Sequence, residues 1–192
     1  IIPASQLARG DGSNTSTIQL CTHTGTHIDA PWHYLEHGKR IHELDPSLFF
    51  GQALLVDTGD NVLLKPAELG TPPLPERLLL KTAFSDFSAT GPFKDNYPAL
   101  SLDAAERLVD EGVRLVGIDS LSVGADNEEG ACIHRLLLAH QVVIVEGLRF
   151  AAVAAGLYEF IVLPLLLAGA DGAPCRAFIR RMAAREGFNH ER

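Results

Sequence analysis

Side chains that can bind a metal ion recur at close, regular spacing near the N-terminus of this chain. His23, His27 and Asp29 fall within seven residues, with Gly25 between the two histidines. In a helix, His23 and His27 would share one face, but Asp29 would point about 160° away from His27. In a strand, alternate residues project to the same side, so all four residues would face one way. The spacing therefore predicts a strand that holds a cation on one face, in the gap left by Gly25.

The types of side chain limit which ion this strand could bind. Two imidazoles and one carboxylate suit zinc, manganese or iron(II) better than magnesium or calcium. A closed structural zinc site would need four Cys or His ligands at finger-like spacing, and the sequence has no such pattern. A catalytic ion keeps an open position for water. We therefore expect a divalent metal with a catalytic role.

Apolar segments separated by turns predict an α/β fold. Strands and helices alternate in the second half of the chain but not in the first, which favours a mixed β-sheet flanked by helices. The length fits a single domain over residues 1–192. The predicted strands are 15–29, 53–57, 77–82, 113–119, 142–146 and 175–179; the predicted helices run from Ser101 to Gly112 and over 133–140 and 149–156, with an irregular arm at 1–14 and a helical turn at 66–70.

Composition narrows the range of partners. A net charge of −8 repels phosphate backbones, so nucleic-acid binding is disfavoured. The longest apolar run near the C-terminus, 160–168, is interrupted by Pro164 and is too short to span a bilayer. Cys21, Cys132 and Cys175 lie far apart without CxxC pairing, which suits a reducing cytoplasm. We expect a cytoplasmic protein that acts on a small molecule, without a membrane or nucleic-acid partner.

Other hydrolytic chemistries find little support. No GxSxG elbow indicates a serine hydrolase, and no HExxH helix indicates a zincin. Cys21 lies two residues before His23, so a ligand or nucleophile role has to be weighed. A small buried apolar residue is the favoured interpretation of Cys21.

The segment from His23 to His33 follows the pattern HxGxHxDxPxH, and further segments downstream extend the match. It resembles the signature of the cyclase-like metal hydrolases, the family of bacterial kynurenine formamidase and isatin hydrolase. The resemblance covers roughly residues 17–180 and implies that family's swivelling β/β/α fold. The downstream segments that carry it are Gly117-Ile118-Asp119-Ser120, His134-Arg135, Glu146-Gly147-Leu148, Leu163-Pro164-Leu165, 169–174 and Arg176-Ala177.

The resemblance implies a site with two metal ions. His23, His27 and Asp29 would be ligands from the first segment, with Asp29 bridging the ions. His134 and Glu146 would complete the site, and Glu146 is a second candidate for a bridging ligand. His33 would be the general acid/base. The usual metal is zinc in the formamidase branch and manganese in the isatin-hydrolase branch.

Reasoning from the residues alone supports Glu146 more than His134. Glu146 ends an apolar strand, where a carboxylate is costly unless it is paired or bound to a metal. Active sites of α/β sheets also gather at the carboxyl ends of strands. His134 alone would be interpreted as a residue at a helix start, and His140 is an alternative with less suitable spacing. His37, His42 and His190 are expected to face solvent.

The leading functional prediction is hydrolysis of an aryl formamide such as N-formylkynurenine. A cyclic amide or lactone hydrolase and a non-catalytic metal-binding protein are the alternatives. Trp32, Tyr34 and some of Phe84, Phe87 and Phe93 could form an aromatic wall for the substrate. The resemblance also implies a homodimer or homotetramer.

The chain departs from the family pattern in places that concern the substrate. No aromatic-Pro-Gly-Asp segment precedes His23, so either that N-terminal segment is missing from this sequence or the substrate pocket differs. Gly147 stands where an Asn is common, and Leu121-Ser122-Val123 differs from the usual loop. These departures affect the choice of substrate rather than the metal.

Overall fold

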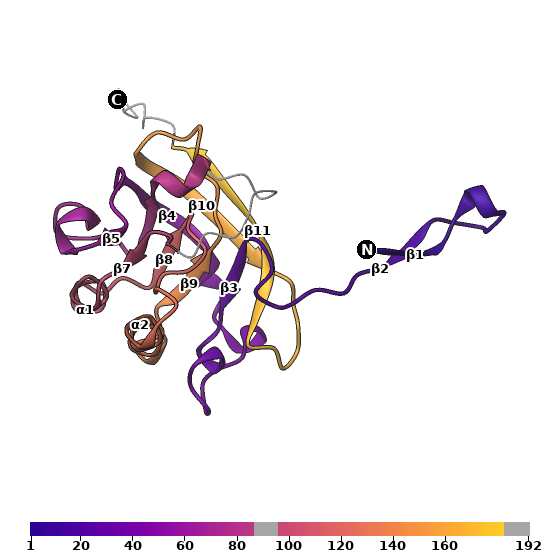
Figure 1. The fold of residues 1–192 in the computed structure, drawn as a ribbon, viewed down its shortest axis with the longest axis horizontal. Coiled ribbons are helices and arrows are strands. Elements are labelled where there is room, and N and C mark those ends of the chain that lie inside the picture. The colour runs from indigo at the N-terminus through magenta and orange to yellow at the C-terminus, as the bar shows by residue number, and fades with distance from the viewer. Residues whose placement is uncertain (87–95, 183–192) are drawn as a thin grey trace, which may run out of the picture.

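The chain folds around a closed seven-stranded barrel with two helices on one flank (Figure 1). The computed structural model describes residues 1–86 and 96–182. The strand order is β10-β11-β3-β9-β8-β6-β4, in which the pairs β4–β6, β6–β8 and β8–β9 are parallel and the others antiparallel. The barrel strands are β3 (His27–Asp29), β4 (Phe50–Asp57), β6 (Arg77–Lys81), β8 (Leu115–Ile118), β9 (Val143–Glu146), β10 (Gly156–Pro164) and β11 (Gly172–Arg181); the helices are α1 (Leu102–Asp110) and α2 (Glu128–Ala139).

Smaller elements connect and extend the barrel. They are β1 (Ile2–Ser5), β2 (Thr15–Thr17), the short parallel pair β5 (Leu63–Leu64) and β7 (Ala99–Leu100), and the 3-10 helices η1 (Leu7–Arg9), η2 (Pro31–His33), η3 (Ile41–Glu43), η4 (Pro46–Phe49), η5 (Pro66–Leu69) and η6 (Ala83–Asp86). In the described part of the chain, no helix combines the length and apolar character needed to cross a membrane. The predicted α/β class with a mixed sheet is confirmed.

The central strands are buried on both faces, which explains their continuous apolar runs. In β6, Leu79 belongs to the apolar cluster inside the barrel, whereas Leu78 and Leu80 pack with residues of α1 and α2. In β9, Val145 faces the barrel interior and Ile144 faces the helices. Because side chains alternate along a strand, a residue two positions after Ile144 also faces the helix-covered side. Glu146, the last residue of β9, occupies that position.

The prediction of one strand over 15–29 is wrong in its middle. The chain forms β2 and β3 at the two ends of this range, with turns and bends between them. Gly25 adopts a left-handed conformation with φ of 67°, which glycine accepts without steric cost and which breaks the extended chain. His23 therefore does not share a strand with His27 and Asp29. It approaches them from a turn.

The N-terminal arm is also more regular than the predicted irregular segment. β1 and β2 pair antiparallel as a hairpin, and Figure 1 shows this hairpin standing apart from the barrel. The side chain of Asn14 accepts a hydrogen bond from the backbone of Leu7 at 2.9 Å, which closes the loop between the strands. Local side-chain bonds of this kind are weak signals in a sequence without apolar periodicity.

Two helix predictions need correction. α2 begins five residues before 133, at Glu128, because the Asn127 side chain caps it by accepting from Gly130 N at 2.9 Å. The helix predicted over 149–156 is absent, and β10 already begins at Gly156. Phe150 is 3% exposed and its amide donates to Ser85 Oγ at 2.9 Å, so tertiary contacts outweigh the helix propensity of this alanine-rich segment.

Gln141, just after α2, offers a test of local backbone strain. Its φ of 62° is left-handed, a conformation in which glycine is favoured at the end of a helix. Gln141→Gly should therefore raise the free energy of unfolding by about 1 kcal/mol, because glycine avoids the roughly 1–2 kcal/mol cost of a left-handed conformation but loses more backbone entropy on folding. Urea denaturation of both proteins measures this difference, and an unchanged or lower stability would show that the glutamine side chain compensates for the strain.

Candidate metal centre

The antiparallel pairing of β3 with β9 brings the first two candidate ligands together. His27 lies directly opposite Glu146, so both side chains point to the helix-covered side. His27 Nε2 lies 3.3 Å from Glu146 Oε2. Asp29, two residues further along β3, shares that side, and its Oδ1 lies 3.3 Å from His27 Nε2. All three residues are at most 4% exposed.

His23 reaches the same cluster from the preceding turn. Its Nδ1 lies 2.8 Å from Asp29 Oδ1. The imidazole rests against Gly172 of β11, the residue paired with Asp29. A Cβ at Gly172 would lie 2.9 Å from His23 Cε1 and 2.7 Å from the carbonyl oxygen of Ile28. The missing side chain at Gly172 therefore makes room for the His23 ring.

A methyl group at this position should disturb the site. We expect Gly172→Ala to destabilise the protein by about 1–3 kcal/mol, since the contact with the Ile28 carbonyl cannot relax easily. It should also weaken zinc binding, because the His23 ring must move. Thermal unfolding and zinc titration measure the two effects. Gly12→Ala is the matched control, because a Cβ there meets nothing within 4 Å; equal behaviour of both variants would contradict the packing argument.

His134 comes from α2, which covers this side of the barrel. Its Nε2 lies 3.3 Å from Glu146 Oε1 and 3.9 Å from Asp29 Oδ2. Glu146 Oε1 also accepts hydrogen bonds from Ser122 Oγ at 2.9 Å and from Val123 N at 2.8 Å. His134 lies within α2, not at its start, and it is the middle of the helix that delivers the imidazole to the end of β9.

The hydrogen bonds of two imidazoles fix which nitrogen faces the carboxylates. His27 Nδ1 lies 2.9 Å from the Gly25 carbonyl oxygen, and His134 Nδ1 lies 2.7 Å from the Gly130 carbonyl oxygen. A carbonyl accepts only, so each Nδ1 carries a proton and donates it. Each Nε2 then faces carboxylate oxygens. In a neutral ring, Nε2 carries a lone pair, and the carboxylate oxygens also present lone pairs, so the two would repel each other. A proton or a cation must lie between them, and this donor arrangement is typical of metal-binding histidines.

Asp29 gives the most direct indication that a cation fits here. Its Oδ2 is buried and has no hydrogen-bond partner among the described residues. One group of potential ligand atoms comprises His23, His27 and Asp29, and another comprises Asp29, His134 and Glu146; within each group the atoms lie within 4.8 Å of one another. An unsatisfied buried carboxylate oxygen is costly, and coordination would remove that cost. The donor set therefore fits one or two divalent cations.

The pKa shifts reflect strong mutual attraction within the cluster. Burial alone would lower the pKa of His27, but hydrogen bonds to Asp29 and Glu146 outweigh it and raise the pKa to about 10. Burial alone would raise the pKa of Asp29, yet hydrogen bonds from His23 and His27 hold it well below its usual range. Burial and the neighbouring Asp29 would raise the pKa of Glu146, but hydrogen bonds with His134 and His27 lower it. Both carboxylates are therefore ionised and the imidazoles balance their charge, a role that a bound cation would share.

His33 lies beside this cluster, with a more exposed side chain. It ends η2, which begins at Pro31, and its ring stacks on His23 with centroids 4.0 Å apart. Burial lowers the pKa of His33, and the neighbouring His23 and His134 lower it further against the attraction of Asp29 and Asp171. His33 is therefore neutral near pH 7 and able to accept a proton. Tyr34 contacts the His33 ring edge-on and stacks on His134, with centroids 4.6 Å apart in each case.

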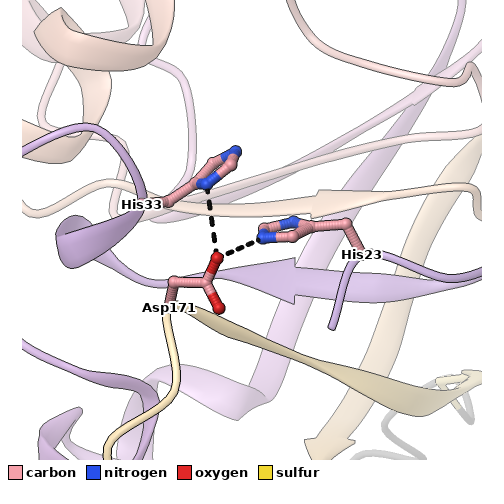
Figure 2. Close-up of side chains that lie close together, drawn as sticks. All are labelled: His23, His33 and Asp171. Carbon is pink, nitrogen blue, oxygen red and sulfur yellow. Dashed lines mark hydrogen bonds and ion pairs between the residues drawn. The ribbon is translucent and has the colours of Figure 1, made fainter. Parts of the chain in front are cut away.

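Sequence reasoning missed one carboxylate, Asp171. It lies in the turn between β10 and β11, and its Oδ2 is 3.0 Å from His23 Nε2 and 3.7 Å from His33 Nδ1 (Figure 2). Asp171, His23 and His33 form a third group of potential ligand atoms. Asp171 belongs to segment 169–174, which carries part of the family resemblance, but its Gly-Ala-Asp-Gly context is one in which Asp usually serves the turn itself, so no site role was predicted for it.

Other candidates lie outside the cluster. His37 and His42 are exposed as expected, and so is His140, whose Nδ1 bonds to the Leu136 carbonyl; His190 lies outside the described residues. The interpretation of Cys21 as buried is wrong, because its side chain is exposed. Trp32 packs under the guanidinium of Arg40, 4.4 Å from the ring centroid. Phe87 and Phe93 also lie outside the described residues.

Comparisons with known proteins identify the family to which this fold belongs. A family model described as putative cyclase matches residues 3–125. A kynurenine formamidase of Bacillus cereus is 38% identical over 169 residues, covering 87% of this chain and 80% of that protein. The kynurenine formamidase of Bacillus anthracis is also 38% identical over the same length, with the same coverage of both chains.

Solved structures show the same architecture. A protein described as a potential metal-dependent hydrolase with cyclase activity is 32% identical with a TM-score of 0.77, covering 87% of this chain and 83% of that one. Isatin hydrolase A from Labrenzia aggregata has a TM-score of 0.71 at 23% identity, covering 91% and 80%, and this likeness concerns the fold alone. Fold and site together define a barrel protein with a His/carboxylate centre suited to divalent cations. The chain belongs to the putative cyclase family, as the sequence predicted.

Proposed function

We propose that this protein is a metal-dependent amide hydrolase that cleaves an aryl formamide, with N-formylkynurenine as the leading substrate. The observation that carries the proposal is Asp29, whose carboxylate is shared by two groups of metal-ligand atoms and keeps one buried oxygen without a hydrogen bond among the described residues. The predicted class, a hydrolase of non-peptide C–N bonds, agrees with the 38% identical kynurenine formamidases.

The proposed ligands divide between two cations. His23, His27 and Asp29 would hold one, and Asp29, His134 and Glu146 the other, so Asp29 would belong to both sets of ligands. Imidazole and carboxylate donors suit zinc, with manganese as the alternative. Divalent cations in such a site supply chemistry that side chains lack, because they lower the pKa of water and polarise a carbonyl group.

His33 is the proposed general acid/base. Hydrolysis adds water to the formyl carbon and breaks its bond to nitrogen, giving formate and the free aryl amine. A proton must leave the water, and the amine nitrogen must gain one. His33 is neutral near pH 7 and half-buried beside the cluster, so it can accept the first proton and deliver it to the amine.

The surroundings of the site suit an aryl group. Tyr34 presents a half-buried ring next to His33 and His134. Aromatic rings attract one another in edge-on and offset-stacked arrangements, so Tyr34 supports an aryl substrate. Trp32 is already covered on one side by Arg40, which makes it a weaker candidate for the aromatic wall.

The test is a substrate panel assayed on metal-loaded protein. N-formylkynurenine, formanilide and isatin should be compared at equal concentration, with formate release measured for the first two and ring opening for the third. We expect N-formylkynurenine to give the highest kcat/KM. Faster opening of isatin would favour the cyclic amide hydrolase, and metal binding without turnover of any amide would favour the non-catalytic alternative.

Assembly and location stay predictions. The hairpin β1–β2 exposes apolar residues such as Ile2 and the neighbouring Ile18, at 62% and 64%, which supports a homodimer or homotetramer that covers them. Light scattering of the purified protein measures the assembly. The three cysteines are free, which supports a reducing cytoplasm.

A further inference from the structure

The carboxylate of Asp171 lies between the two imidazoles that stack on each other at the edge of the cluster. Figure 2 shows one carboxylate oxygen directed at both rings. This oxygen, Oδ2, lies 3.0 Å from His23 Nε2 and 3.7 Å from His33 Nδ1. The three side chains are between 19% and 33% exposed, so water screens this contact only in part.

Two hydrogen bonds hold Asp171 in place, one from each side of the segment His23 to Asp29. Its second carboxylate oxygen, Oδ1, accepts a hydrogen bond from Thr22 Oγ1 at 3.0 Å. Its backbone carbonyl accepts from Ala30 N at 2.9 Å. Thr22 precedes His23, and Ala30 precedes the 3-10 helix that carries His33. The turn between β10 and β11 is therefore attached to the chain on either side of the proposed ligands.

For His23, this contact decides which nitrogen is free to bind a cation. Nδ1 faces Asp29 and Nε2 faces Asp171. A neutral imidazole carries one proton, and a proton on Nε2 would be donated to Asp171. The electron pair then lies on Nδ1, on the side of His27 and Asp29. A carboxylate that accepts from the outer nitrogen of a metal-binding histidine holds the ring in place and makes it a better donor.

For His33, the same oxygen lies next to Nδ1, and the other ring nitrogen points away from Asp171 (Figure 2). A negative oxygen beside Nδ1 favours the tautomer with the proton there, which leaves Nε2 as the proton acceptor. The separation of 3.7 Å exceeds that of a hydrogen bond, but such contacts often tighten only when substrate binds.

We propose that Asp171 is a positioning residue shared by His23 and His33: it sets the tautomer of both rings, one for binding a cation and the other for proton transfer. This inference rests on the proposed hydrolase function. Loss of the Asp171 carboxylate should therefore have two separate effects. Metal binding should weaken through His23, and turnover should slow through His33.

Asp171→Asn keeps the size of the side chain and removes its charge. We expect zinc affinity to fall by about 10–100-fold, the loss typical of an outer partner of a metal ligand. At saturating zinc, kcat should remain at least about 10-fold below wild type, while KM changes less than about twofold, since Asp171 contacts neither the proposed ligands' carboxylates nor the proposed aromatic wall. Zinc competition with a chromogenic chelator and steady-state kinetics measure the two effects.

Matched variants separate this role from a general disturbance. Thr22→Val removes the hydrogen bond that holds Asp171 and should reproduce part of both effects, whereas Thr22→Ser keeps the hydroxyl and should restore them. Asp60→Asn removes an exposed carboxylate outside the cluster and should change nothing. Thermal unfolding of each variant shows whether the fold is retained.

Nitrogen NMR of histidine-labelled protein tests the inference without relying on activity. In the zinc-loaded wild type, where the cation takes the place of a proton between His23 Nδ1 and Asp29, His23 and His33 should show the tautomers with the proton on Nε2 and on Nδ1, respectively. Asp171→Asn at the same zinc concentration should shift both rings toward tautomer mixtures. Unchanged tautomers and zinc affinity in Asp171→Asn would overturn the inference. If the wild type cleaves no aryl formamide, the proposed function fails, but the NMR and zinc measurements still decide the role of Asp171.

Discussion

Replacing His33 with alanine should lower kcat for aryl formamide hydrolysis by roughly 10²–10⁴-fold, the range expected when a general acid/base is removed. Without His33, the amine has to leave without a proton from a positioned group. The metal content should stay at the wild-type level, because the five proposed ligands are untouched. Kinetics at saturating substrate, together with elemental analysis of the same sample, measure both quantities.

Two controls sharpen this experiment. His37→Ala removes an exposed histidine from the same segment and should keep wild-type activity. His33→Gln keeps a polar side chain of similar reach but cannot act as a base, so it should be as slow as the alanine variant. Wild-type turnover in His33→Ala would exclude the acid/base role. Loss of metal in that variant would instead indicate that His33 is a ligand. This is geometrically possible, because the potential ligand atoms of His33, His23 and Asp171 lie within 4.8 Å of one another.

Replacing Asp29 should have the larger effect on metal binding. Its carboxylate is the one side chain common to both inner groups of ligand atoms in the described structure, and it is 1% exposed. We expect Asp29→Ala to lose the metal on purification and to show only background activity. The loss in zinc affinity should exceed the roughly 100-fold typical of outer partners, because the cation loses a direct anionic donor.

Asp29→Asn distinguishes the loss of a metal ligand from a folding defect. The amide keeps the volume of the buried side chain but removes its charge, so the metal should be lost while the fold persists. Circular dichroism and thermal unfolding establish the fold, and Asp60→Ala is the control at an exposed position. An Asp29→Ala protein that retains wild-type zinc affinity would contradict the ligand assignment.

The central strands of the barrel could be predicted because a strand that is buried on both faces is a continuous run of apolar residues. Leu78 to Leu80 and Val143 to Val145 are apolar at every position, since one face meets the barrel interior and the other meets the helices. That these strands close into a barrel could not be predicted. Closure depends on long-range pairings such as Gly172 with Asp29, which leave no periodic signal in the sequence.

The candidate ligands were predicted for two different reasons, and their role as ligands stays a prediction. His27 and Asp29 follow from their alternation along a strand, and the structure places them on the same side of β3. His23 was predicted by the same argument, but Gly25 turns the chain and His23 arrives from outside the strand. His134 came from the family resemblance, since a histidine in the middle of α2 shows no local sign of its contact with Glu146.

Asp171 illustrates what sequence reasoning lacks. The residue lies 148 positions from His23, and only the antiparallel pairing of β11 with β3 brings the two together. The glycine that follows Asp171 looks like a turn residue, yet it also leaves the space that the His23 ring occupies. Both roles depend on packing between segments that are distant in the chain.

The most direct test of the account is metal removal from the wild-type protein. The purified chain is reconstituted with zinc or manganese, analysed for bound metal, treated with a chelator and assayed with N-formylkynurenine before and after each step. We expect up to two divalent ions per chain, loss of hydrolysis on chelation and recovery when the metal is restored. A protein that holds no divalent ion after reconstitution, or that hydrolyses the substrate equally well in the chelator, would contradict the account.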